Sequence, residues 1–196
     1  MTKNEKPEKE NTPEPDFLME SVFVAESDVA AETNVTSKGL HIRIRPATAN
    51  DAESIEIILS TYFLDREDIP YENFIVAEME SGKSFKIIGC AVYNRFRSPN
   101  FESFYEIHTI AVLPSYKNKG IGRQLLLALV SDILKSGEPA LSTTVYTRTT
   151  SPEFFIREGF SMIENDEKKE LWQECRDCAK FETCIQKALS KLVKYN

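Results

Sequence analysis

A basic loop that contains two glycines joins an apolar run to a leucine-rich segment near the middle of the chain. Its positive side chains are Lys117, Lys119 and Arg123, and its glycines are Gly120 and Gly122. A glycine-containing loop that opens a helix leaves backbone N–H groups unpaired, and the helix dipole adds partial positive charge at the same end. The loop therefore predicts a binding site for a phosphate-like anion.

Two common nucleotide-binding motifs do not fit these residues. A dinucleotide fingerprint needs a third glycine where the chain has Leu125, and a phosphate-cradling P-loop needs the run Gly-Lys-Ser/Thr, which the loop lacks. The anion site must therefore belong to another kind of fold.

The elements that position the loop can be predicted from hydrophobic periodicity and turn residues. Strands are predicted at 41–46, 74–80, 85–93, 104–112 and 140–146, with a last strand directly after Phe160, and helices after the capping residues 48–51, over 121–135 and over 151–158. Short links between the middle strands indicate an antiparallel meander. The strand at 140–146 should lie parallel to 104–112, because a helix between two strands forms a right-handed crossover.

At these residues the chain resembles the GNAT acetyltransferase superfamily, over roughly residues 41–163. The family signature is a strand, then (Gln/Arg)-x-x-Gly-x-(Gly/Ala), then a helix, and the frame here runs from Lys117 to Gly122, with lysine where Gln or Arg is usual. The resemblance implies an α/β (α+β) fold. Its central sheet would be mixed and mostly antiparallel, and helices would flank a β-loop-α unit that binds acetyl-CoA.

The resemblance also implies which backbone groups hold acetyl-CoA. The pyrophosphate would lie on N–H groups of Asn118, Lys119, Gly120, Ile121, Gly122 and Arg123, and the side chain of Lys117 would add positive charge beside it. The thioester would lie beside the end of the preceding strand, at Ile110, Ala111 and Val112. A backbone N–H of Ile110 or Val112 would stabilise the oxyanion, and the sequence does not choose between the two.

Acetyl transfer to an amine also needs a base, because an amine is mostly protonated at neutral pH. Glu106 lies where several GNAT enzymes have a catalytic glutamate, and His108 should share its face because strand periodicity is two. The alternatives are a cross-strand ion pair for Glu106 and a core position for His108. In many GNAT enzymes a tyrosine at the position of Phe155 protonates the leaving CoA thiolate. Phenylalanine cannot donate a proton, so Tyr146 or water must protonate the thiolate here.

Composition narrows the class of protein. The chain has 196 residues, 41% of them hydrophobic, and a net charge of −7. That charge argues against a nucleic-acid partner, and no apolar run is long enough to span a membrane. We expect a cytoplasmic protein with a disordered acidic tail over 1–38, a GNAT domain over 39–165 and a cysteine-containing helical extension over 166–196. The oligomeric state is open, with a homodimer as one alternative.

Three of the four cysteines lie in the C-terminal part, at Cys175, Cys178 and Cys184. Their first spacing suits a zinc or iron–sulfur ligand pair, but three thiolates are one short of a closed site. Buried or redox-active thiols are the alternative.

The C-terminal part carries a second resemblance, through Trp-x-x-Cys-x-x-Cys-x-Lys-Phe-x-x-Cys at 172–184 together with 71–74 and 152–155. These residues look like those of the short, kinase-less N-acetylglutamate synthases. The resemblance implies acetylation of the α-amine of glutamate, as in arginine biosynthesis, with arginines binding the carboxylates. Candidates are Arg95 and Arg97, and also Arg45 and Arg148. The family commonly has arginine at the position of His108.

The sequence therefore predicts an enzyme that transfers acetyl from acetyl-CoA to a small-molecule amine, most plausibly that of glutamate or a related amino acid. Two alternatives stay open. One is a protein acetyltransferase acting on N-terminal or lysine amines, and the other is a non-catalytic acyl-CoA sensor.

Overall fold

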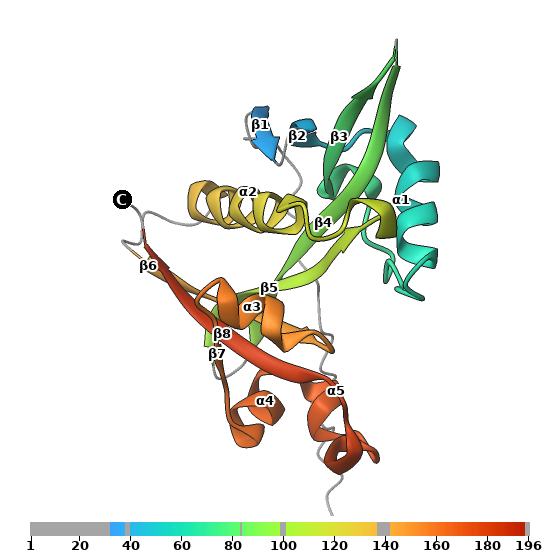
Figure 1. Ribbon diagram of the computed structural model, residues 1–196. Coiled ribbons are helices and arrows are strands. Elements are labelled where there is room, and N and C mark those ends of the chain that lie inside the picture. The colour runs from blue at the N-terminus through green and yellow to red at the C-terminus, as the bar shows by residue number, and fades with distance from the viewer. Residues whose placement is uncertain (1–31, 38–39, 83, 99–100, 137–141, 195–196) are drawn as a thin grey trace, which may run out of the picture.

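One sheet organises the part of the chain that the structure describes. The computed structural model describes residues 32–37, 40–82, 84–98, 101–136 and 142–194, and their eight strands follow the order β1-β2-β3-β4-β5-β6-β8-β7 (Figure 1). The strands are β1 (Thr33–Ser37), β2 (Leu40–Pro46), β3 (Ile75–Ser81), β4 (Ser84–Ser98), β5 (Phe101–Val112), β6 (Ser142–Thr149), β7 (Ser161–Met162) and β8 (Lys187–Lys194). The α-helices are α1 (Ala52–Ser60), α2 (Ile121–Ser136), α3 (Pro152–Arg157), α4 (Asn165–Leu171) and α5 (Gln173–Arg176), and short 3-10 turns lie at Ala49–Asp51, Tyr71–Asn73, Pro114–Tyr116 and Phe181–Thr183.

The sheet has two halves that meet at a short parallel contact. Strands β1 to β5 form an antiparallel meander, and β6, β8 and β7 form a second antiparallel group. Among the residues that the structure describes, the two halves pair with each other only where residues 105–107 of β5 lie parallel to residues 145–147 of β6. The predicted mixed, mostly antiparallel sheet with a crossover helix is confirmed.

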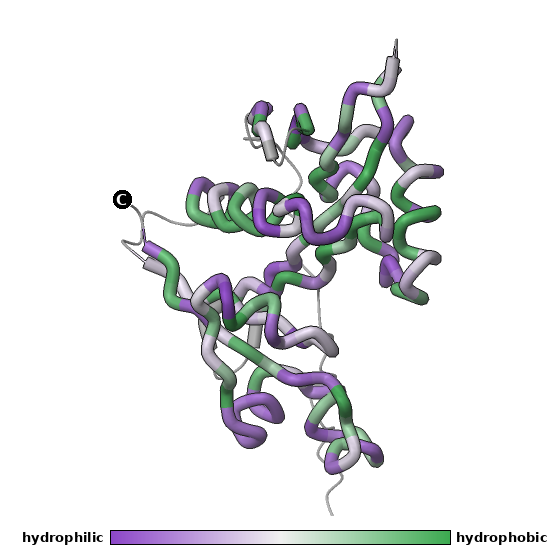
Figure 2. The backbone as a smooth tube through the Cα atoms, in the orientation of Figure 1, coloured by the Kyte–Doolittle hydropathy of each residue, from purple (hydrophilic) through white to green (hydrophobic). Residues whose placement is uncertain are grey.

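Helices cover both faces of the sheet. On one face, α2 packs its apolar stripe of Ile121, Leu125, Leu129 and Ile133 onto the meander, as the helical spacing requires. Gly89 of β4 makes this close packing feasible, because a Cβ there would lie 3.2 Å from Leu125 Cδ1. On the opposite face, α1 packs against β3 and β4. Figure 2 shows hydrophobic and hydrophilic colours alternating along β8 and mainly hydrophilic colour on α4.

The N-terminal prediction needs a correction. Residues 33–37, which the composition assigns to a disordered tail, form β1 and pair antiparallel with β2 from Thr33↔Ile44 to Ser37↔Leu40. The β-branched residues Thr33, Val35 and Thr36 favour a strand, and the edge of β2 offers backbone partners. The rest of the predicted tail, residues 1–31, lies outside the described residues.

The C-terminal prediction is also partly wrong. Residues 166–196 contain the expected helices α4 and α5, but their last part forms β8, which lies between β6 and β7. Eight residue pairs join β8 to β6, from Ser142↔Lys194 to Thr149↔Lys187. The strand expected directly after Phe160 is the two-residue β7 at the edge. Because Leu189 and Val193 are buried in the main core, this segment is part of the fold and not an appendage.

Candidate active site

The loop between β5 and α2 has the backbone conformation of an anion site. Asn118 and Gly120 both adopt left-handed conformations, with φ of 59° and 80°. The first helical bond runs from the N–H of Gln124 to the carbonyl of Gly120, at 3.1 Å. The N–H groups of residues 121–123 therefore precede the ladder and have no acceptor within the helix. These N–H groups have the geometry expected for an anion site, whereas the N–H of Lys117 donates to the Pro114 carbonyl at 3.2 Å. The pyrophosphate site from Lys117 to Arg123 stays a prediction.

Positive side chains surround this loop. The Nζ of Lys117 lies 4.4 Å from the ring centroid of Tyr62, and that of Lys119 lies 5.6 Å from the ring of Tyr116. Arg123 donates from Nε to Glu158 Oε2 at 3.1 Å, and its side chain is more than half exposed. The two lysines are therefore held near the loop by aromatic rings, whereas the charge of Arg123 is balanced by a carboxylate.

Next to the loop, β5 has an edge that β6 does not cover. The β5–β6 pairing ends at Ile107↔Thr147, where the Thr147 hydroxyl donates to the Ile107 carbonyl at 3.0 Å. Beyond this point the N–H of Leu113 bonds to the Ile88 carbonyl of β4 at 2.9 Å. Because N–H directions alternate along a strand, those of Ile110 and Val112 point to the uncovered edge. The Val112 carbonyl shares this direction and accepts a hydrogen bond from the hydroxyl of Tyr62. The oxyanion role of Ile110 or Val112 stays a prediction.

Glu106 is held by three donors in a buried network. Its side chain is 2% exposed, and it accepts bonds from Arg148 Nε at 2.8 Å and Arg148 Nη2 at 3.3 Å. The indole Nε1 of Trp172 donates to Glu106 Oε2 at 2.8 Å. Burial alone would lower the pKa of Arg148, but the Glu106 and Glu174 carboxylates raise it overall, so this guanidinium stays charged. The cross-strand ion pair, the alternative for Glu106, is present.

His108 lies where the two halves of the sheet separate. Val92 of β4 pairs with Thr109 and Tyr93 pairs with Ile107, so His108 is the extra residue of a β-bulge. Its side chain is 11% exposed, and Nδ1 lies 3.9 Å from Glu67 Oε2. Glu67 has a left-handed backbone, with φ of 52°. Sequence reasoning missed Glu67, because it lies in a polar connection without any motif.

The other predicted site residues are Tyr146, Arg95 and Arg97. Tyr146 packs edge-on against Phe104 and Trp172, and burial raises the pKa of its hydroxyl. Arg95 lies over the ring of its register partner Tyr105, at 5.6 Å. Since Tyr105 and Glu106 are adjacent on a strand, Arg95 is on the face opposite Glu106. Arg97 belongs to β4, and its side chain is outside the described part.

The three C-terminal cysteines are in different surroundings. Cys175 is buried 3.9 Å from Arg148 Nη1, Cys184 lies 3.7 Å from Lys168 Nζ, and Cys178 is exposed. Among the described residues no group of three or more histidine, cysteine or acidic side chains could hold a metal ion. The zinc or iron–sulfur alternative therefore has no ligand set here, and burial raises the pKa of the Cys175 thiol.

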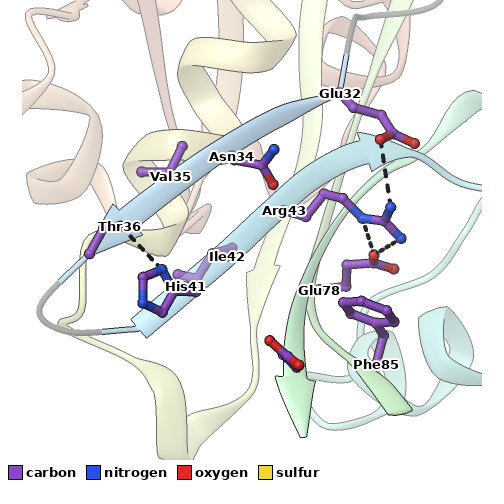
Figure 3. Close-up of a pocket in the computed structure, with 10 residues that line it drawn as sticks. Glu32, Asn34, Val35, Thr36, His41, Ile42, Arg43, Glu78 and Phe85 are labelled. Carbon is purple, nitrogen blue, oxygen red and sulfur yellow. Dashed lines mark hydrogen bonds and ion pairs between the residues drawn. The ribbon is translucent and has the colours of Figure 1, made fainter. Parts of the chain in front are cut away.

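A cavity of about 460 Å³ lies away from this site, among β1, β2, β3 and the start of β4 (Figure 3). Its charged side chains pair with one another: Arg43 binds the buried Glu78 and lies 3.6 Å from Glu32. Arg45, another predicted carboxylate ligand, is bound to Glu78 and Asp51. Neither arginine faces the uncovered edge of β5.

Comparison with known proteins identifies the family to which a chain with this fold and loop belongs. The profile of the Acetyltransferase (GNAT) family matches residues 41–160. An uncharacterized N-acetyltransferase of Chlorobaculum tepidum is 29% identical over 125 residues, which are 61% of this chain and 70% of that protein. The chain therefore belongs to the GNAT acetyltransferase family and is an acetyl-CoA-dependent N-acetyltransferase.

Solved structures share the fold at low identity. The N-acetylglutamate synthase of Neisseria gonorrhoeae, complexed with coenzyme A and N-acetyl-glutamate, aligns with a TM-score of 0.60 and 21% identity, over 79% of this chain and 35% of that one. Rv2747 of Mycobacterium tuberculosis, in complex with CoA, aligns with a TM-score of 0.58 and 22% identity, over 76% of this chain and 98% of that one. This chain thus spans about a third of the Neisseria protein. Within the described residues no helix is long and apolar enough to cross a membrane.

Proposed function

We propose that this enzyme acetylates the α-amine of glutamate or of a related amino acid. The observation that carries the proposal is the uncovered edge of β5, which runs from the bulge at His108 to the amide-lined loop before α2. A thioester placed along this edge would have its pyrophosphate at the loop and its acetyl group near His108. The Neisseria synthase, which was solved in complex with N-acetyl-glutamate, supports the choice of acceptor.

In the proposed mechanism, backbone groups handle the thioester. The N–H groups of residues 118–123 bind the pyrophosphate, and Lys117 and Lys119 add positive charge. The N–H of Ile110 or Val112 donates to the thioester oxygen and stabilises the oxyanion that forms when the amine attacks.

His108 is the better placed of the two predicted bases. It is the bulge residue at the uncovered edge, and Glu67 lies beside Nδ1, so Nε2 can accept the proton of the acceptor ammonium, directly or through one water. Glu106 is the other predicted base, but its oxygens already accept three bonds, which favours a supporting role. The tetrahedral intermediate then expels the CoA thiolate, which takes a proton from water or from Tyr146.

The test is acetyl-CoA consumption by the purified full chain with each of the twenty amino acids and with peptides that have free N-termini. We expect turnover with glutamate or a close relative, and little with peptides. Turnover on peptides alone would favour the protein acetyltransferase. Naa50 of Arabidopsis thaliana, solved in complex with the bisubstrate analogue CoA-Ac-MVNAL, shares the fold with a TM-score of 0.53 and 16% identity. Binding of acetyl-CoA without turnover on any amine would favour the sensor. The cytoplasmic location and a step in arginine biosynthesis stay predictions that depend on glutamate as the acceptor.

A further inference from the structure

We propose that Cys175 and Cys178 are a peroxide-sensitive pair, which forms a reversible disulfide and thereby disturbs the buried network around Glu106. This Glu106 network consists of the carboxylate of Glu106 and its two donors, Arg148 and Trp172. The inference goes beyond the proposed function, because the pair lies outside the family match, which ends at residue 160, and because it holds for any acceptor.

The backbone holds the two cysteines at a spacing that suits a disulfide. Cys175 belongs to α5, and the N–H of Cys178 donates to the carbonyl of Cys175 at 3.4 Å. A bond of this kind closes a four-residue turn, in which the first and last Cα atoms lie within about 7 Å of each other. Disulfides join Cα atoms that are about 4.4–6.8 Å apart. The turn therefore allows Cys175 and Cys178 to be joined with little movement of the backbone.

The two thiols differ in their surroundings. Cys178 is exposed, so a peroxide in solution reaches its sulfur, whereas Cys175 is 8% exposed and packs in a cluster with Trp172 and Phe104. Burial raises the pKa of the Cys175 thiol, although Arg148, whose Nη1 lies 3.9 Å from Sγ, acts in the opposite direction. Cys178 is therefore the thiol that meets the oxidant, and Cys175 is the thiol that completes the disulfide.

The reaction consists of two balanced steps, with hydrogen peroxide as the oxidant. The sulfur of Cys178 attacks one peroxide oxygen, the O–O bond breaks, and a sulfenic acid and one water form. The sulfur of Cys175 then attacks the sulfenic sulfur, the S–O bond breaks, and the hydroxyl group leaves as a second water with the proton of the Cys175 thiol. The two thiols are oxidised and the peroxide is reduced, and a thiol reductant reverses the disulfide by exchange.

The third cysteine of the segment has other neighbours. The Sγ of Cys184 lies 3.7 Å from Lys168 Nζ and 3.9 Å from the carbonyl oxygen of Gln186. Two successive turns separate it from Cys178, because the N–H of Phe181 donates to Cys178 at 3.1 Å and the N–H of Cys184 donates to Phe181 at 3.0 Å. Cys184 is therefore a matched control for the pair.

The disulfide changes the packing beside the Glu106 network. An S–S bond is about 2.05 Å long, so an exposed and a buried sulfur cannot be joined while both keep their places. Either Cys175 moves outward from Arg148, or Cys178 moves inward against the cluster. Both movements reach Trp172, whose carbonyl accepts the N–H of Cys175 at 3.0 Å. Trp172 is the only tryptophan of the chain and is fully buried, so its fluorescence reports the change.

The test compares Cys178→Ser with Cys184→Ser in the full chain, before and after treatment with hydrogen peroxide. Alkylation of free thiols and mass spectrometry should show that the wild type and C184S lose two hydrogen atoms and the alkylation of Cys175 and Cys178. In the same two proteins the tryptophan emission should shift to longer wavelength, and kcat should fall by about tenfold, the effect of about one lost hydrogen bond to a charged group. A thiol reductant should reverse both changes, and C178S should show neither.

Several results would overturn the pair. One is an oxidised Cys178 that carries only added oxygen while Cys175 still reacts with the alkylating reagent, and another is a disulfide that disappears in C184S. A disulfide between Cys175 and Cys178 that leaves both the emission and kcat unchanged would overturn its link to the Glu106 network. The masses and the emission need no acceptor, and kcat is measured with the amine that the wild type acetylates fastest. Failure of glutamate as the acceptor therefore removes the proposed function without affecting this test.

Discussion

Trp172 and Glu106 are 66 residues apart in sequence, and the indole N–H of one donates to the carboxylate of the other at 2.8 Å. Trp172 is fully buried, and its ring contacts Phe104 and Tyr146 edge-on. The bond ties the C-terminal segment to β5 beside the point where the sheet opens. Together with the contacts of Glu174 and Cys175 to Arg148, it links a segment outside the family match to the candidate site.

Trp172→Phe tests this contact. The change keeps an aromatic ring but removes the donor to a buried carboxylate, so it should lower the free energy of unfolding by about 1–3 kcal/mol. Urea denaturation measures the loss. Tyr146→Phe is the control for stability, because it trims a neighbouring ring of the same cluster and should leave the free energy of unfolding within about 1 kcal/mol of wild type. A W172F protein as stable as wild type would contradict the role of this bond.

Glu106→Gln tests the charge of the same network. The change keeps the side-chain size but leaves the Arg148 guanidinium without its buried counter-ion, so we expect a loss of stability of about 3 kcal/mol. Turnover should fall far more than the affinity for acetyl-CoA, because the loop that binds the pyrophosphate is distant from this network. Steady-state kinetics with both substrates, at a temperature where the variant is folded, would make the comparison. Wild-type turnover would remove Glu106 from the mechanism.

His108→Gln tests the proposed base. Loss of a general base typically costs about 100-fold or more in kcat, so kcat should fall by that order while the KM for acetyl-CoA stays the same. Glu67→Gln, which alters only the group beside Nδ1, should lower kcat less than H108Q does. If H108Q retains the wild-type kcat, His108 is not the base.

Sequence reasoning succeeded where the chemistry is local and failed where it is not. The loop from Lys117 to Gly122 could be predicted because a glycine-containing helix start has the same anion-binding geometry in any context. Strand periodicity predicted a shared face for Glu106 and His108, but it could not predict the β-bulge at His108, which interrupts the regular alternation there. The partner of Glu106 could not be predicted, because a buried carboxylate is paired by residues that only tertiary packing brings near, here from β6 and from the segment after α4. The strand β8 was missed because its hydrophobic pattern is compatible with a helix or a strand. Only the pairing with β6 in the folded sheet selects the strand.

Stability should depend on acid pH through Asp51. The hydrogen bond from Arg45 lowers the pKa of Asp51 to about 2, against burial that would raise it, and Thr48 donates two further bonds. Because this pKa is lower in the folded chain than its ordinary value near 3.8, the stabilisation is complete above that value and is lost as the pH falls through about 2.

Asp51→Asn should therefore lower the free energy of unfolding at pH 7, and the gap to wild type should shrink as the pH falls from about 5 to about 2. Denaturation series at several pH values would measure it. Asp177→Asn is the control, since Asp177 is exposed beside Arg176 at 3.6 Å and should show no such convergence. A gap that is constant with pH would mean that Asp51 acts only as a helix cap.

The loop between β5 and α2 can be tested by comparing two glycines that both have a positive φ. Gly120 and Gly82 have φ of 80° and 66°, so Gly→Ala adds comparable local strain at both, about 1 kcal/mol. Gly82 lies in the β3–β4 hairpin, where an added methyl group would meet no other atom within 4 Å, whereas Gly120 opens α2, where the pyrophosphate is expected to lie. Gly120→Ala should therefore raise the KM for acetyl-CoA by about tenfold or more, through the altered amide directions, while Gly82→Ala leaves it unchanged. Equal effects of the two variants on KM would mean that strain alone acts, and that the amides before α2 do not hold the cofactor.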